Sequence, residues 1–179
     1  MKNINFKSAI LVLSLVGISL QASAQKKSEL VKNLEKDAYA AYMNKEYTKA
    51  IESLQHLDTM PSKVAPMYDY WMGMCLLSTD NKAAAIPYLE SAKKSDMTSF
   101  VVNYYLGRAY LYQGRVEEAS KHLGLYAREY LSRGIKFERS EEPVSEAHRV
   151  HVEKTLNDVY ALLAKCEIEI ENRKLTSIK

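Results

Sequence analysis

The sequence predicts an all-α fold of three helical hairpins and one long closing helix. Six glycines and four prolines interrupt 179 residues, of which 47% are hydrophobic, and this composition suits a helical single domain. A triplet of two small residues and one large apolar residue recurs at nearly constant spacing, which indicates an internal repeat. The triplets are Ala38, Ala50 and Leu54, then Gly73, Ala85 and Leu89 after 35 residues, then Gly107, Ala119 and Leu123 after a further 34.

The first 24 residues are typical of a secretory signal peptide. Lys2 and Lys7 precede a 12-residue apolar run over residues 9–20, and residues 22–24 form a small-x-small cleavage site. The run is shorter than the roughly 20 residues that span a bilayer, so we expect export without a membrane span after cleavage. The mature chain is then predicted to begin at Gln25, and the alternative is an uncleaved anchor.

The first repeat is predicted over residues 28–62. Its first helix is expected over residues 28–44, with Ser28 as the N-terminal cap and Ala38 on the apolar face. The partner helix is expected over residues 47–57, ahead of Pro61, because proline cannot continue a helix without losing a hydrogen bond.

The second repeat is predicted over residues 63–97. Pro66 is expected to open its first helix, because the first helical position needs no N–H donor. Asn81 is expected to cap a partner helix that ends at Lys94. Pro87 then falls inside that helix and predicts a slight bend.

The third repeat, residues 98–132, predicts helices over residues 98–112 and 115–131 with a tight turn at Gly114 between them. Two small residues, Gly107 and Ala119, allow these helices to approach closely where they cross. The larger residues that fill the space around the crossing are Leu106, Tyr110 and Leu123.

A polar connection over residues 133–142 is expected to lead into a closing helix over residues 143–173. No triplet member stands one period after Gly107, so this helix is not a fourth repeat. Its apolar stripe is expected to cover the end of the third repeat. The stripe contains Val152, Leu156, Val159, Leu163, Cys166 and Ile170.

The pattern of Leu106, Gly107, Tyr110, Ala119 and Leu123 resembles that of tetratricopeptide repeats. The resemblance covers about residues 28–132. It implies a right-handed solenoid in which the first helices of the repeats line a concave groove, with a capping helix at the C-terminal end.

A more specific resemblance lies in the segments YWMGMCLLSTDNKAAAIPYLESA and LLAKCEIEIENRKL. Both are similar to the N-terminal repeat module of exported Bacteroidota envelope proteins that also carry β-propeller-like and OmpA-like domains. The resemblance implies a periplasmic or outer-membrane-associated location. Neither additional domain follows in this sequence, so it resembles that module standing alone or a truncated member, and peptidoglycan binding is not implied.

Charge and motifs favour no catalytic or nucleic-acid function. Without the first 24 residues, 23 basic residues face 22 acidic ones with no basic run, which gives nucleic acid no electrostatic support. The sequence contains no hydrolase, nucleotide-binding or zinc-protease motif, so we expect no enzyme, cofactor or metal. His148 and His151, three residues apart, are expected to be solvated. Cys75 and Cys166 are expected to be buried free thiols rather than a disulfide.

The functional hypothesis is based on the tyrosines, which are unusually frequent. The sequence contains thirteen tyrosines but only three phenylalanines and one tryptophan. In a tetratricopeptide-like fold, one or two residues per repeat would face the groove outside the packing triplets. We expect a non-catalytic scaffold that binds a protein or peptide there, and the alternative is a permanent structural subunit of an envelope assembly. The expected groove residues are Tyr39, Tyr42, Tyr70, Met74, Tyr104 and Arg108.

Overall fold

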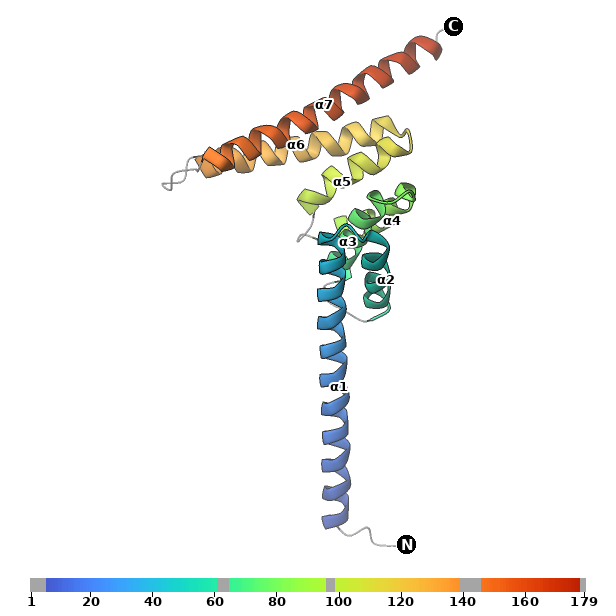
Figure 1. Cartoon of the computed structure of the whole chain (residues 1–179), viewed down its shortest axis with the longest axis vertical. Helices are drawn as coiled ribbons and strands as arrows, with labels where there is room; N and C mark the ends of the chain where they lie inside the picture. Colours follow the sequence, from blue (N-terminus) through green and yellow to red (C-terminus); the bar gives the residue numbers. More distant parts are fainter. Residues whose placement is uncertain (1–5, 61–64, 96–98, 139–145, 178–179) are drawn as a thin grey trace.

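The computed structural model describes the backbone of residues 6–60, 65–95, 99–138 and 146–177 (Figure 1). Side chains are described for residues 21, 23–60, 65–95, 100–133 and 153–177. Within these ranges every regular element is a helix, so the predicted all-α class is confirmed.

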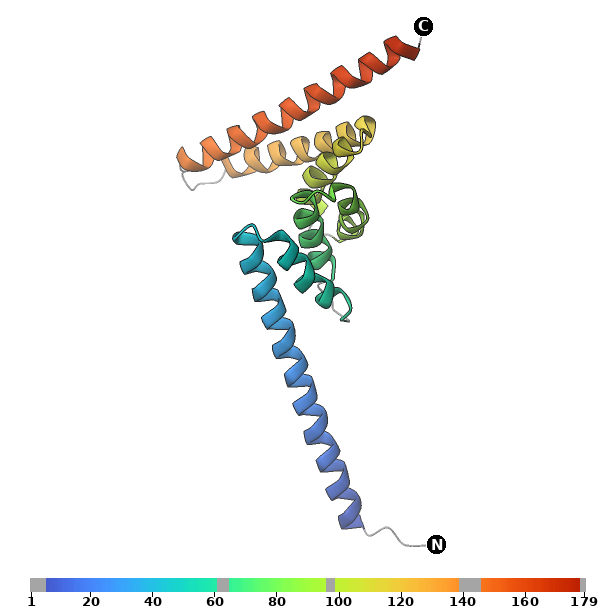
Figure 2. The ribbon, with the colours of Figure 1, turned by 45° about the vertical axis from the view of Figure 1, so that its right-hand side comes forward.

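The helices form three hairpins in chain order. The helices of each hairpin pack together, α2 packs against α3, α4 packs against α5, and α6 packs against α7. The first helices α3 and α5 also touch each other. Figures 1 and 2 show the N-terminal part of α1 running away from the hairpins and α7 lying along α6. The elements are α1 Phe6–Met43, α2 Tyr47–Asp58, α3 Ala65–Leu77, the 3₁₀ turn η1 Lys82–Ala84, α4 Ala85–Lys93, α5 Ser99–Tyr112, α6 Val116–Glu138 and α7 Glu146–Ser177.

Two glycines mark the closest helix crossings. A Cβ atom on Gly107 would lie 2.5 Å from Cγ of Leu123 and 3.3 Å from the carbonyl oxygen of Ala119. A Cβ atom on Gly73 would likewise lie 2.5 Å from Cγ of Leu89. In the second and third hairpins the leucine of the second helix therefore rests directly on the glycine of the first helix, as the triplet predicts.

The core follows the repeat. The triplet members of all three hairpins are buried, and Leu54, Leu89 and Leu123 are among the largest fully buried side chains. Between the hairpins, the Tyr68 hydroxyl on α3 donates a hydrogen bond of 2.6 Å to Oε1 of Glu35 on α1. The repeated residues thus form one continuous apolar core along the chain.

The turns of the first and third hairpins have the same conformation. Lys45 has φ 63° and Gly114 has φ 68°, and both lie in the left-handed region. In each turn this residue and the next close the helix through backbone hydrogen bonds. The N–H groups of Lys45 and Gly114 donate to the carbonyls of Tyr42 and Leu111, and those of Glu46 and Arg115 donate to the carbonyls of Ala41 and Tyr110, at 2.8–3.0 Å.

The second hairpin has a different turn. The Thr79 hydroxyl donates to the Leu76 carbonyl and accepts from the N–H of Asn81. A 3₁₀ turn follows, and Asn81 makes no capping hydrogen bond with its side chain, so the predicted cap is wrong. Because the 3₁₀ turn delays the α-helix to Ala85, Pro87 lies in the first turn of α4 and not deep inside a helix.

Two predicted helix boundaries are also wrong, and the predicted start of the closing helix stays untested. α1 begins at Phe6 and passes through Ser28, because no proline separates the two regions. α6 continues through the polar segment to Glu138, since its residues other than Gly134 are compatible with a helix. α7 begins at Glu146 and extends to Ser177, and the predicted opening residue Pro143 lies outside the described residues.

The closing helix α7 packs along α6 of the third hairpin. Val159 and Cys166 are fully buried in the core, and Leu163 packs against it. Leu156 and Ile170 are half-buried, whereas the side chain of Val152 lies outside the described residues. Near the other end of α7, Nη2 of Arg173 donates a hydrogen bond of 2.9 Å to the carbonyl oxygen of Gly114.

Both cysteines are free and buried, so that prediction is confirmed. Burial raises the pKa of the Cys75 thiol to about 11, which keeps it protonated and weakly reactive at neutral pH. Among the described residues, no helix is long and apolar enough to cross a membrane.

The helix crossing at Gly107 makes a direct stability prediction. Gly107→Ala places a methyl group against Leu123, so we expect the free energy of unfolding to fall by about 1–3 kcal/mol. Gly124→Ala is the matched control, because nothing lies within 4 Å of its added Cβ and alanine favours the helix. Urea unfolding measures both variants. Equal stability of the two variants would contradict the crossing.

The shared turn makes a second prediction. Lys45→Gly removes the cost of a left-handed lysine and should stabilise the protein by about 0.5–1 kcal/mol. Gly114→Ala imposes that cost on the equivalent position and should destabilise it by about 1 kcal/mol. Thermal melting checks both changes. A lower melting temperature for Lys45→Gly would refute the equivalence of the two turns.

Candidate functional site

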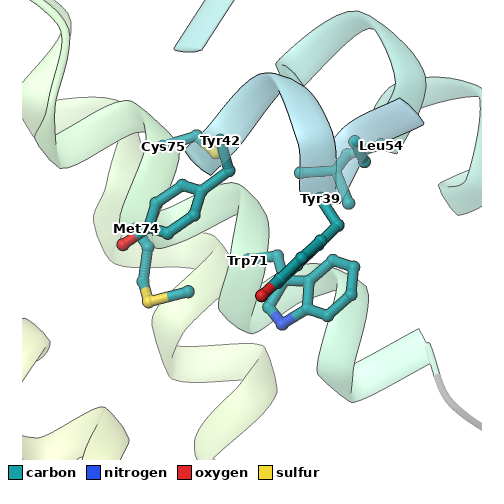
Figure 3. Close-up of a pocket in the computed structure, with 7 residues that line it drawn as sticks. Tyr39, Tyr42, Leu54, Trp71, Met74 and Cys75 are labelled. Atoms are coloured by element: carbon teal, nitrogen blue, oxygen red, sulfur yellow. The ribbon is translucent and has the colours of Figure 1, made fainter. Parts of the chain in front are cut away.

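A small apolar cavity lies between α1 and α3 (Figure 3). Its volume is about 100 Å³, and its lining surface is almost entirely apolar. For scale, a dry cavity of about 150 Å³ holds benzene. The volume therefore suits one aliphatic side chain. The lining residues are Ala38, Tyr39, Tyr42, Leu54, Trp71, Met74 and Cys75.

Helical spacing brings these side chains together. Tyr39 and Tyr42 stand three residues apart on α1, and Trp71, Met74 and Cys75 follow the same rule on α3. In Figure 3 the rings of Tyr39 and Trp71 lie side by side at one wall of the cavity. Their centroids are 6.4 Å apart, and Tyr39 remains 55% exposed. The cavity therefore has a solvent-facing aromatic rim.

The structure divides the six predicted groove residues into two groups. Tyr39, Tyr42 and Met74 line the cavity together. Tyr70 and Tyr104 instead pack into an aromatic cluster between α3, α5 and α6. Arg108 lies next to this cluster, with its guanidinium 5.6 Å from the centroid of the Tyr104 ring.

Between α3 and α5, the rings of the aromatic cluster fill the space between the two first helices. Between α1 and α3, the corresponding space is left as the cavity. Tyr70 meets Tyr105 edge to face at 5.6 Å, Tyr105 meets Tyr104 at 5.2 Å, and Tyr104 meets Tyr126 at 5.3 Å. Burial raises the pKa of Tyr70, as do the nearby charge and hydrogen bond of Tyr105. Burial also raises the pKa of Tyr126 to about 12. These tyrosines are therefore mainly structural.

Two side chains at the site, Trp71 and Tyr105, were not predicted to have a role. Trp71 forms a wall of the cavity, and its position two residues before Gly73 in the repeat was an available signal. Tyr105 joins Tyr70 to Tyr104 in the aromatic cluster. Its place beside Leu106 gave no sign that it points toward the preceding hairpin.

A buried polar cluster joins α4, α5 and α6 on another part of the molecule. His122 is only 5% exposed, and its Nδ1 lies 2.8 Å from Oδ1 of Asn103, an acceptor, so Nδ1 carries the proton. The His122 ring stacks on Tyr110 at 5.5 Å, and the Tyr110 hydroxyl donates to Oε1 of Glu90 at 2.5 Å. Arg115 covers the Tyr110 ring at 4.4 Å.

The remaining histidines do not build a site among the described residues. His56 is exposed on α2. The side chains of His148 and His151 lie outside the described residues, so the prediction that they are solvated stays untested. Across the part of the chain that the structure describes, no group of three histidine, cysteine or carboxylate side chains is placed to hold a metal ion.

No family model and no curated protein matches this chain.

Burial of His122 predicts a pH-dependent stability. Desolvation, followed by the charge of Lys93, lowers the pKa of His122 to about 4, whereas an unfolded histidine titrates near 6.5. The folded state therefore holds a neutral ring while the unfolded state takes up a proton. This contribution to stability is complete above about pH 6.5 and is lost as the pH falls toward about 4.

The His122→Gln variant tests this dependence. Glutamine keeps a hydrogen-bond donor for Asn103 but does not titrate. We expect urea unfolding between pH 7 and pH 4 to show a steeper loss of stability in the wild type than in the variant. Parallel curves over this range would show that His122 is not buried in the neutral form.

Proposed function

We propose that this chain is a non-catalytic scaffold that binds a segment of another protein on the surface formed by α1, α3 and α5. The observation that carries this proposal is the apolar cavity between α1 and α3 with its exposed aromatic rim. An apolar side chain from a partner would fill the cavity and cover Tyr39 and Trp71. Aromatic anchors in fully desolvated pockets supply much of the binding energy at protein interfaces.

The helical repeat supports a tetratricopeptide-like scaffold. Equivalent leucines rest on Gly73 and Gly107, and equivalent turns occur at Lys45 and Gly114. Stacked helical hairpins of this kind present extended surfaces that suit protein binding. Since the first hairpin carries alanine at the same triplet position, we propose three tetratricopeptide-like repeats over about residues 28–132, closed by α7.

We also propose that the protein acts outside the cytoplasm, in the periplasm or at the outer membrane. The support is the sequence of residues 1–24, with its basic start, apolar run and small-residue cleavage site. The near balance of charges in the remaining chain favours a protein partner over nucleic acid.

A permanent role in an envelope assembly is the second candidate. The observation that favours it is a row of exposed apolar side chains on α7, formed by Tyr160, Ile168 and Leu175. Their spacing of eight and seven residues places them on one face of the helix. This face points away from the one that buries Val159 and Cys166, so a permanent neighbour could cover it.

Two matched tyrosine variants discriminate between the candidates. Tyr39→Ala removes the rim of the cavity and should reduce capture of the partner from envelope extract at least tenfold, as expected for an aromatic anchor. Its melting temperature should stay close to that of the wild type, because the ring is 55% exposed. Capture is quantified by mass spectrometry of proteins retained on the immobilised chain.

Tyr160→Ala is the control, since this tyrosine is 46% exposed but lies on α7. Partner capture should not change in this variant. Loss of capture in Tyr160→Ala with normal capture in Tyr39→Ala would reject the cavity and favour the assembly subunit.

A further inference from the structure

Arg108 is a half-buried cation without a carboxylate partner among the described residues. Arg115, Arg133 and Arg173 each lie within 3.2 Å of a glutamate oxygen. Arg108 instead lies over the Tyr104 ring, and no described carboxylate oxygen is within 4.0 Å of it. A partly desolvated guanidinium gains most from a carboxylate, which it can bind through two parallel hydrogen bonds.

Positive charge extends past Arg108 along the same surface. Nζ of Lys82 lies 5.4 Å from the centroid of the Tyr112 ring, and Tyr112 stands one turn after Arg108 on α5. Lys82 donates a hydrogen bond to the backbone carbonyl of Thr79, which does not neutralise it. A carboxylate at Arg108 would therefore meet a positive environment.

Tyr42 connects this charge to the apolar cavity. Tyr42 lines the cavity, and burial raises its pKa while the charge of Arg108 acts in the opposite direction. The packing of α3 on α5 supplies the geometry, because Tyr70 meets Tyr105 at 5.6 Å, and Met74 of the cavity and Arg108 each stand one turn further along their helices. A ligand that occupies the cavity would have its neighbouring residues near Arg108.

We infer that the cavity and Arg108 together recognise an acidic peptide segment, in which an aliphatic side chain fills the cavity and a nearby aspartate or glutamate pairs with Arg108. This inference rests on the proposed function and adds the chemistry of the partner. In an extended peptide, side chains two positions apart lie on the same face, so the acidic residue is placed two positions from the aliphatic one.

The surface favours a segment within a chain over a C-terminal carboxylate. Exposed side chains continue on both sides of the cavity and Arg108, with Met43 on α1 and Tyr112 on α5. A peptide that ended at Arg108 would leave Tyr112 uncovered, whereas a continuing chain would pack on it.

Trp71 gives a direct readout, because it is the single tryptophan of the chain and lines the cavity. The probes are the blocked peptides acetyl-Glu-Gly-Leu-Gly-Glu-amide and acetyl-Gln-Gly-Leu-Gly-Gln-amide, which contain no aromatic residue. Tryptophan fluorescence titrations at low salt give their dissociation constants. We expect the acidic peptide to bind roughly tenfold more tightly, as a charge-assisted hydrogen bond would predict.

Substitutions of Arg108 test whether this side chain causes the preference for the acidic peptide. Arg108→Gln should bind the two peptides equally, Arg108→Lys should keep a reduced preference, and the control Arg128→Gln on α6 should behave as the wild type. The comparison of the two peptides on the wild-type protein needs no substitution, so it tests the acidic preference even if a variant is unstable. The wild-type preference should also shrink as salt is added.

The outcomes separate this inference from the proposed function. Equal binding of both peptides by the wild type, with a Trp71 response to each, would refute the acidic preference and leave the cavity as a binding site. Tighter binding of acetyl-Gly-Gly-Leu with a free C-terminal carboxylate than of the acidic blocked peptide would refute the internal segment. No Trp71 response to any probe would overturn both proposals.

Discussion

A leucine resting on a glycine of the facing helix is the contact on which the rest of this structure depends. It occurs between Leu89 and Gly73 and again between Leu123 and Gly107. Without a Cβ atom at the glycine, the second helix of the hairpin comes close enough to bury the leucine fully. That approach sets where α3 and α5 lie in their hairpins, whereas on α1 the buried residue Ala38 takes the place of the glycine.

The same arrangement produces different surroundings at successive first helices. Between α3 and α5, Tyr70 and Tyr105 meet edge to face and join a larger group of rings. Between α1 and α3, Tyr39 stays on the rim and a cavity of about 100 Å³ remains. The apolar cavity between α1 and α3 thus lies beside a space between α3 and α5 that tyrosine rings fill, and Arg108 lies against these rings.

The repeat spacing was enough to predict the helix pairs and their contacts, because small residues are required where helices cross. It could not predict the 3₁₀ turn before Pro87, which depends on hydrogen bonds of Thr79. Nor could it separate exposed Tyr39 from packed Tyr70, since both were predicted on the inner face of their helices, one turn apart in the repeat. That difference comes from rings on α5, which are distant in the sequence. The burial of His122 likewise depends on Asn103 and Tyr110 from the facing helix.

The central claim is that two hairpins are built on the same leucine-to-glycine contact. Nuclear Overhauser effects between leucine methyl groups and glycine α-protons test it most directly, in protein labelled at both residue types. Cross-peaks are expected from Leu89 to Gly73 and from Leu123 to Gly107, because an added Cβ at either glycine would lie 2.5 Å from its leucine. Absence of either cross-peak, with both residues assigned, would contradict the repeated packing and the arrangement of α3 and α5 derived from it.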